Sequence, residues 1–161
     1  MNLAHRKILI GISGGIAAYK SAYLVRLLVK AGADVQVVMT PAATEFITPL
    51  TFEALIDREV PVEMFPRQRF TGTHHITLAN WPDIITVTPA SADILAQVAN
   101  GFCPSLLATI ICATRRKVIW APSMNEAMFA NPAVQANIRT LADRGHIMAE
   151  VGIGEMACKS Y

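Results

Sequence analysis

Several features that would assign the protein to a special class are lacking. No apolar run approaches the roughly 20 residues that a membrane-spanning helix requires. Lys and Arg outnumber Asp and Glu by only 14 to 12, and they are scattered along the chain. The basic residues near the start precede an apolar run of strand length only, so we expect no signal peptide. We therefore expect neither a membrane nor a nucleic-acid partner.

Cysteine is also scarce. The three cysteines, Cys103, Cys112 and Cys158, are odd in number and do not have the spacing of a metal site. We expect no metal, no disulfide framework and a reducing, cytoplasmic location. Nothing electropositive surrounds Cys103 or Cys112 in the sequence, so both are predicted to be buried structural thiols.

What the chain does contain is enough apolar residues for one core. Hydrophobic residues make up 53% of its 161 residues and charged residues only 16%, which predicts a single domain over residues 1–161. Strands alternate with helices, which predicts an α/β sandwich on a mostly parallel sheet. The expected strands are 8–10, 35–39, 83–88, 117–120 and 147–148, with an edge strand at 60–65. The expected helices are 16–31, two short pieces within 46–55, 92–100, 104–113 and 132–144.

The helix at 16–31 is predicted to turn one apolar side toward the core. At 3.6-residue spacing this side contains six residues, namely Ile16, Tyr23, Leu24, Leu27, Leu28 and Ala31. Lys20 falls in the middle of that side, which predicts snorkelling or an ion pair. The pair His74 and His75 follows a polar, irregular stretch and is expected in a loop.

A glycine-rich turn separates the first strand from this helix. Gly11, Gly14 and Gly15 interrupt the pattern between them. Free backbone N–H groups at the start of a helix favour an anion such as phosphate, although a bare turn is the alternative. The spacing matches neither G-x-G-x-x-G nor the P-loop. Thr40 ends the second strand where an NAD enzyme would carry an acid, which favours a mononucleotide or a plain phosphate.

Polar and small residues follow the other strands as well, at 89–93 and 122–125. Because the carboxyl ends of parallel strands meet at one edge of a sheet, these loops are expected to share one cleft with the glycine turn and Thr40.

Six motifs occur in order and together cover essentially the whole chain. They are S-G-G-I-A-A-Y-K (13–20), F-I-T-P-L-T (46–51), H-I-T-L-A-N-W-P-D (75–83), P-A-S-A-D (89–93), P-S-M-N-E-A-M-F (122–129) and M-A-C (156–158). In this series the chain resembles the flavin-containing cysteine decarboxylases, most closely those of coenzyme A biosynthesis. The resemblance implies a Rossmann-like, three-layer fold of the flavoprotein type.

The implied activity is FMN-dependent decarboxylation of 4'-phosphopantothenoylcysteine to 4'-phosphopantetheine. Transient oxidation of the cysteine to a thioaldehyde supplies the electron sink that loss of CO2 requires, and reduction then restores the thiol. The resemblance also implies a homotrimer or a dodecamer, with FMN at subunit contacts. Within the family, a peptidyl-cysteine decarboxylase of lantibiotic maturation is the alternative. From a different functional class, a non-catalytic, flavin-binding regulatory subunit of the halotolerance type is another. A flavin prenyltransferase is a more distant one.

The family's functional residues carry over by motif. By this resemblance, the FMN phosphate is bound by Ser13, Gly14, Gly15 and Thr40. The flavin is contacted by Ser91 and Ala92. The catalytic histidine is His75, Asn125 binds the substrate carboxylate beside Met124 and Met128, and Cys158 assists the final reduction. The chemistry of two of these residues suits their roles, since an imidazole exchanges protons near neutral pH. A neutral amide binds a carboxylate without stabilising its charge as strongly as arginine would.

Overall fold

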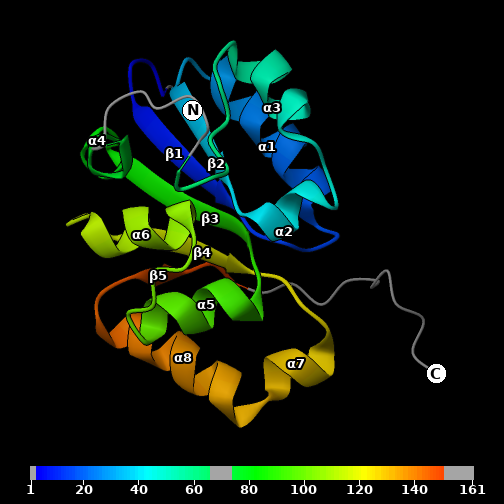
Figure 1. Ribbon diagram of the computed structural model, residues 1–161, viewed down its shortest axis with the longest axis vertical. Helices are drawn as coiled ribbons and strands as arrows, with labels where there is room; N and C mark the ends of the chain where they lie inside the picture. Colours follow the sequence, from blue (N-terminus) through cyan, green and yellow to red (C-terminus); the bar gives the residue numbers. More distant parts are fainter. Residues whose placement is uncertain (1–2, 66–73, 151–161) are drawn as a thin grey trace.

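The computed structural model describes residues 3–65 and 74–150, and one parallel sheet runs through them (Figure 1). Its five strands have the order β2-β1-β3-β4-β5. The strands are β1 (Lys7–Ile12), β2 (Asp34–Met39), β3 (Ile84–Ala90), β4 (Val118–Pro122) and β5 (Ile147–Met148). This confirms the expected α/β class, and every strand pair in the described part of the chain is parallel.

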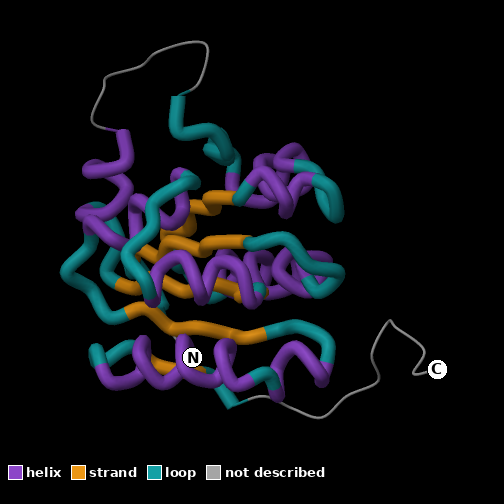
Figure 2. Tube along the Cα trace, turned by 60° about the horizontal axis from the view of Figure 1, so that its bottom comes forward, coloured by secondary structure: helices purple, strands orange, loops and turns teal. Residues whose placement is uncertain are grey.

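Helices cover both faces of the sheet and make the fold three-layered (Figure 2). They are α1 (Ala18–Lys30), α2 (Pro41–Thr44), α3 (Pro49–Ile56), α4 (His74–Asn80), α5 (Ala92–Ala99), α6 (Leu106–Ala113), α7 (Glu126–Ala130) and α8 (Pro132–Asp143). No helix in these residues is long and apolar enough to cross a membrane.

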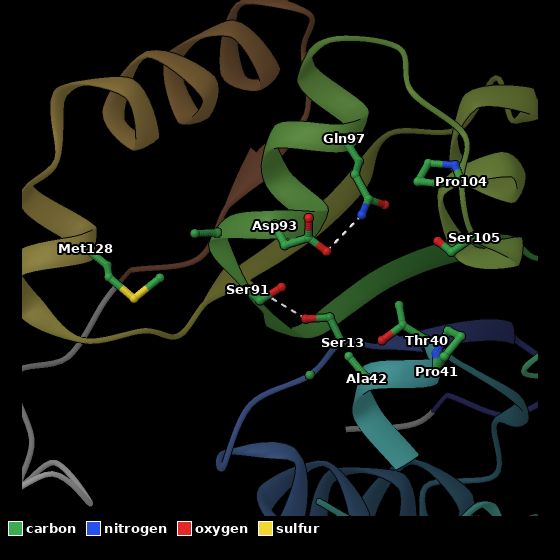
Figure 3. A pocket seen from close by; sticks show the side chains of 12 residues that line it. Ser13, Thr40, Pro41, Ala42, Ser91, Asp93, Gln97, Pro104, Ser105 and Met128 are labelled. Atoms are coloured by element: carbon green, nitrogen blue, oxygen red, sulfur yellow. Dashed lines mark hydrogen bonds between the residues drawn. The ribbon is translucent and has the colours of Figure 1, made fainter. Parts of the chain in front are cut away.

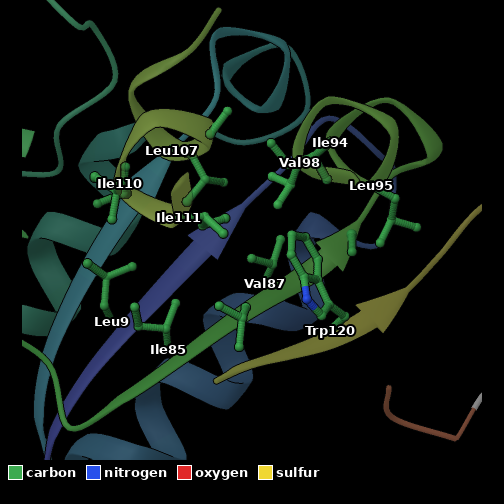
Figure 4. Close-up of a cluster of buried hydrophobic side chains, with 14 of the residues drawn as sticks. Leu9, Ile85, Val87, Ile94, Leu95, Val98, Leu107, Ile110, Ile111 and Trp120 are labelled. Atoms are coloured by element: carbon green, nitrogen blue, oxygen red, sulfur yellow. The ribbon is translucent and has the colours of Figure 1, made fainter. Parts of the chain in front are cut away.

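Alternation along the strands divides the core into two clusters. In β1, Ile8 and Ile10 pack with α1 and α3, whereas Leu9 packs with α4, α5, α6 and α8 on the opposite face. Figure 4 shows the second cluster, where α5 and α6 cover Ile85, Val87 and the fully buried Trp120. Burial on both faces explains why the strands contain continuous aliphatic runs.

The chain reverses its direction across the sheet between β1 and β3. From β1 it crosses through α1 to β2 on one side, and from β3 it crosses through α5 and α6 to β4 on the other. The loops that leave β1 and β3 therefore diverge, and they open a crevice at the carboxyl edge. Open α/β sheets bind their ligands at such a switch point.

The predicted inner side of the first helix is wrong. The fully buried residues of α1 are Ala18, Ser21 and Val25, while Ile16 and Tyr23 are 58% and 68% exposed. Small residues face the sheet because α1 crosses it closely, and the Ser21 hydroxyl donates to the carbonyl of Thr88 at 2.6 Å. Lys20 is consequently exposed, and its ammonium lies 5.9 Å from the Tyr19 ring centroid.

Two further expectations are contradicted. Residues 60–65 form no strand, and this segment is attached to β2 by the Met39 N–H, which donates to the carbonyl of Pro61 at 3.0 Å. Proline lacks the N–H that a ladder would need in return. His74 and His75 begin helix α4 instead of lying in a loop.

The side chain of His146 holds the start of β4 and makes the stability of the protein depend on pH. The Val118 N–H donates to Nδ1 of His146 at 3.1 Å, so this nitrogen must be unprotonated. Burial, and then the charge of Arg144, lower the pKa of His146 below its usual 6.5. Since the unfolded chain binds this proton more readily, stability is full above pH ~6.5 and is lost as the pH falls through the lowered pKa.

We expect the urea midpoint of the wild type to fall between pH 7.5 and pH 5 more steeply than that of His146→Asn. The asparagine Oδ1 can accept the same N–H and does not titrate. Parallel curves for the two proteins would show that His146 contributes nothing to the pH dependence.

Candidate functional site

A cavity of about 460 Å³ lies at the carboxyl edge of the sheet, at the switch point (Figure 3). It is lined by Ser13, Gly14, Thr40, Pro41, Ala42, Ser91, Ala92, Asp93, Gln97, Pro104, Ser105 and Met128. The loops after β1, β2 and β3 all contribute, as the sequence predicts. A second hollow, beside Glu53, Asp57, Arg58 and Glu59, contains none of the predicted site residues.

Ser13 joins two walls of this cavity. Its buried hydroxyl donates to the carbonyl of Pro89 at 2.7 Å and accepts the N–H of Ser91 at 2.8 Å. Its only hydroxyl proton is therefore used within the protein. Ser13 positions the loops on either side of the crevice, and its side chain has no proton left for a bound phosphate in this arrangement.

Ser13→Ala should lower the free energy of unfolding by about 1–3 kcal/mol, because it leaves the Ser91 N–H without an acceptor and removes the hydroxyl bond to the Pro89 carbonyl. The matched comparison is Ser21→Ala, which removes a buried hydroxyl that only donates. Urea unfolding of both variants measures the difference. If Ser13→Ala were no more destabilising than Ser21→Ala, the bridging role would be disproved.

The glycine turn offers unpaired amides to the cavity. Within the described residues, the N–H groups of Gly14 and Gly15 have no acceptor, and the first turn of α1 begins with the Ala18 N–H on Gly15. Gly14 also fits tightly against the next loop, because a Cβ built there would lie 2.7 Å from Cβ of Ala42. A side chain at Gly14 would therefore push the turn away from α2.

Two further helices begin at the cavity. Ser91 caps α5 by accepting the Ile94 N–H at 3.4 Å, and Ser105 caps α6 by accepting the Ala108 N–H at 3.2 Å. The starts of α5 and α6 therefore line the same cavity, which favours an anionic ligand. Thr40 caps α2 through an accepted bond from the Ala43 N–H, so its hydroxyl proton remains available.

One end of the cavity carries an amide with an unused acceptor. Nε2 of Gln97 donates to Asp93 at 2.8 Å, while its buried Oε1 has no partner. Asp93 lies in the expected loop 89–93, whereas Gln97 and Ser105 are site residues that the sequence did not predict. The signals that could have found them are the i, i+4 spacing of Asp93 and Gln97 and the helix-capping position of Ser105.

The substrate-side residues lie partly at the same edge. Met128 lines the cavity from α7, and Asn125 caps that helix by accepting the Ala127 N–H at 2.8 Å. Met124 packs against the core. Gly15 belongs to the turn but is not among the lining residues.

His75 is far from the cavity within one chain. It is half-buried in α4, which lies at the edge where the strands begin (Figure 1). Just beyond that helix, the Asp83 N–H donates to the carbonyl of Lys7, the first residue of β1. Cys158 lies outside the described residues. Among the described residues, no cluster of His, Cys, Asp or Glu could hold a metal ion.

Comparisons with known proteins agree with this arrangement. A family model described as Flavoprotein matches residues 1–160. The coenzyme A biosynthesis bifunctional protein CoaBC of Vibrio cholerae is 49% identical over 157 residues, which is 98% of this chain but only 39% of that relative's length. The chain thus spans about two fifths of that relative.

Two solved structures are also similar. The FMN-dependent cysteine decarboxylase SpaF is 30% identical with a TM-score of 0.84, over 91% of this chain and 84% of SpaF. A PPC decarboxylase variant complexed with pantothenoylaminoethenethiol is 27% identical with a TM-score of 0.76, over 90% of this chain and 81% of that one.

Proposed function

Because this chain belongs to the Flavoprotein family, we propose that it binds FMN and decarboxylates 4'-phosphopantothenoylcysteine to 4'-phosphopantetheine in coenzyme A biosynthesis. The observation that carries the proposal is the cavity at the switch point, where the glycine turn with its unpaired amides meets the starts of α5 and α6. The high identity to CoaBC supports this substrate.

Two features of the cavity fit a flavin mononucleotide. The close approach of Gly14 to Ala42 holds the glycine turn against the start of α2 and forms a cradle, in which backbone amides can hold a phosphate. At the other end, the unpaired Oε1 of Gln97 can accept an N–H or O–H from a larger, polar ligand. A bare phosphate would leave this second group unused.

The phosphate binds to the amides of Gly14 and Gly15 and to the hydroxyl of Thr40, while Ser13 holds the turn in place. Ser91 and Ala92 would lie along the flavin. When bound, FMN supplies reversible removal of a hydride from the carbon that bears sulfur, which gives CO2 an electron sink on the substrate.

The remaining roles concern the substrate. Asn125, next to Met124 and Met128, binds the carboxylate through a neutral amide, which does not oppose loss of its charge. His75 accepts or returns the thiol proton during oxidation and reduction. Cys158 assists the final reduction of the enethiol.

His75 and the cavity lie at opposite edges of the same sheet, so one chain cannot complete this site alone. We propose that a neighbouring copy supplies His75 within a homotrimer, or within a dodecamer of trimers. Exposed apolar residues on α1 support such contacts, since Tyr19 and Tyr23 are 61% and 68% exposed beside the glycine turn.

A peptidyl-cysteine decarboxylase is the second candidate, since the similar structure of SpaF is described only as that of an FMN-dependent cysteine decarboxylase. Both candidates require flavin. Protein purified in the presence of FMN should be yellow, with the two visible absorption bands of a bound flavin. A colourless protein that cannot be loaded with FMN would rule out both candidates.

A further inference from the structure

Two cysteines meet on the surface next to the cofactor cavity. Cys103 lies in the loop before α6 and Cys112 in the last turn of that helix. Both are free and exposed, so the expectation that they are buried structural thiols is wrong. The sequence pattern failed here because α6 buries its leucines and isoleucines on one side and leaves Cys112 on the other.

The loop folds back along the helix and brings the two thiols together. Oγ1 of Thr109 donates to the carbonyl of Cys103 at 3.3 Å, which holds that residue against the middle of α6. Cys112 is three residues after Thr109 and therefore shares its face of the helix. The Cys103 side chain acts on the pKa of Cys112, as a neighbouring thiol does. The Cys103 thiol in turn donates to the carbonyl of Gly101 at 3.8 Å.

We propose that Cys103 and Cys112 form a redox modification site, in which a hydroperoxide converts the two thiols into an intramolecular disulfide. This inference does not rest on the proposed function. The Cys103 backbone is held against the helix face that carries Cys112, and Cys103 belongs to a loop that can adjust to disulfide geometry more easily than two helical residues could.

The two thiols have different parts in the reaction. Burial and the neighbouring Cys103 raise the pKa of Cys112 to about 11, so Cys112 stays protonated at neutral pH. Cys103 is therefore the thiol that attacks first, since the thiolate is the nucleophile. Its thiolate takes the outer oxygen of the hydroperoxide and becomes a sulfenic acid, while the O–O bond breaks and the other oxygen leaves as an alcohol or water.

Cys112 then resolves the sulfenic acid. Its sulfur attacks the Cys103 sulfur, the S–O bond breaks, and the released hydroxide takes up the Cys112 proton as water. Two thiols and one hydroperoxide thus give one disulfide, one alcohol or water, and one water. The two electrons lost by sulfur reduce the O–O bond, and a dithiol reductant reverses the change.

Peptide mapping of the full chain tests this proposal. The segment Phe70–Arg115 contains no Lys or Arg before its last residue, so trypsin releases Cys103 and Cys112 together and without Cys158. The reduced, folded protein is treated with equimolar hydrogen peroxide, unfolded, alkylated with N-ethylmaleimide and digested. We expect this peptide without any alkyl group and lighter by two hydrogen atoms, and we expect it to gain two alkyl groups after treatment with dithiothreitol.

Cys103→Ser and Cys112→Ser are the matched controls, and both replace exposed side chains. Neither variant should give the lighter, unalkylated peptide, and one equivalent of peroxide should convert Cys103 in Cys112→Ser to a sulfenic acid or an intermolecular disulfide. Complete alkylation of both cysteines in the treated wild type would overturn the proposal. A disulfide of either residue with Cys158 or with another chain as the main product would overturn it too.

Discussion

His75→Asn should reduce the rate of CO2 release from 4'-phosphopantothenoylcysteine by a factor of about 10²–10⁴ without weakening the binding of FMN. The variant removes the group proposed to manage the thiol proton, and none of the groups proposed to hold FMN belongs to α4. Cofactor binding should therefore be unaffected. Turnover measured by CO2 release, with FMN affinity measured in parallel, separates the two effects.

His74→Asn is the control, because His74 is the exposed neighbour on the same first turn of α4. Its rate should remain within about twofold of the wild type, as surface substitutions away from a site usually do. Equal losses in the two variants would point to a disturbed helix, and full activity in His75→Asn would remove this residue from the mechanism.

Co-expression tests whether different copies supply His75 and Asn125. His75→Asn and Asn125→Ala chains are each expected to be inactive alone. Mixed oligomers should regain part of the activity, because some sites then combine an intact His75 with an intact Asn125. A mixture as inactive as its parents would contradict a site shared between copies.

Gly14→Ala should weaken FMN binding at least tenfold, which corresponds to about 1.4 kcal/mol. The new Cβ would lie 2.7 Å from Cβ of Ala42 and 3.1 Å from its carbonyl carbon, so the turn has to move away from the start of α2. The amides proposed to hold the phosphate would move with it. Quenching of FMN fluorescence on titration with protein measures the affinity.

The compensating variant is Ala42→Gly, which removes the atom that the new Cβ meets. Added to Gly14→Ala, it should recover much of the affinity but not all of it, because the Ala42 backbone remains close. Ala42→Gly alone should bind FMN nearly as the wild type does. An unchanged affinity in Gly14→Ala would refute the cradle as the phosphate site.

The fold could be predicted where local signals were strong. Asn131 and Pro132 begin α8 as expected, and Gly145 follows its end with a φ of +87°. The inner side of α1 could not be predicted, because hydrophobic spacing does not say which of two apolar sides meets the sheet. The helical start at His74 depends on packing between α4 and α6, which joins residues far apart in the sequence.

The site residues also divide into those that the sequence predicts and those that it does not. Ser13, Gly14, Thr40, Ser91 and Ala92 meet in one cavity because the carboxyl ends of parallel strands must share an edge. Ser105 and Gln97 were not predicted, because neither lies in a loop that directly follows a strand. The internal use of the Ser13 hydroxyl could not be foreseen either, because its partners, Pro89 and Ser91, are distant in the sequence.

Mass spectrometry of the reaction product tests the central claim most directly. The FMN-loaded protein is incubated separately with 4'-phosphopantothenoylcysteine and with a peptide that ends in cysteine. We expect the first substrate to lose the mass of one CO2 and nothing else, and the peptide to stay unchanged. Conversion of the peptide alone, with loss of CO2 and two hydrogen atoms, would contradict the claim and favour a peptidyl-cysteine decarboxylase.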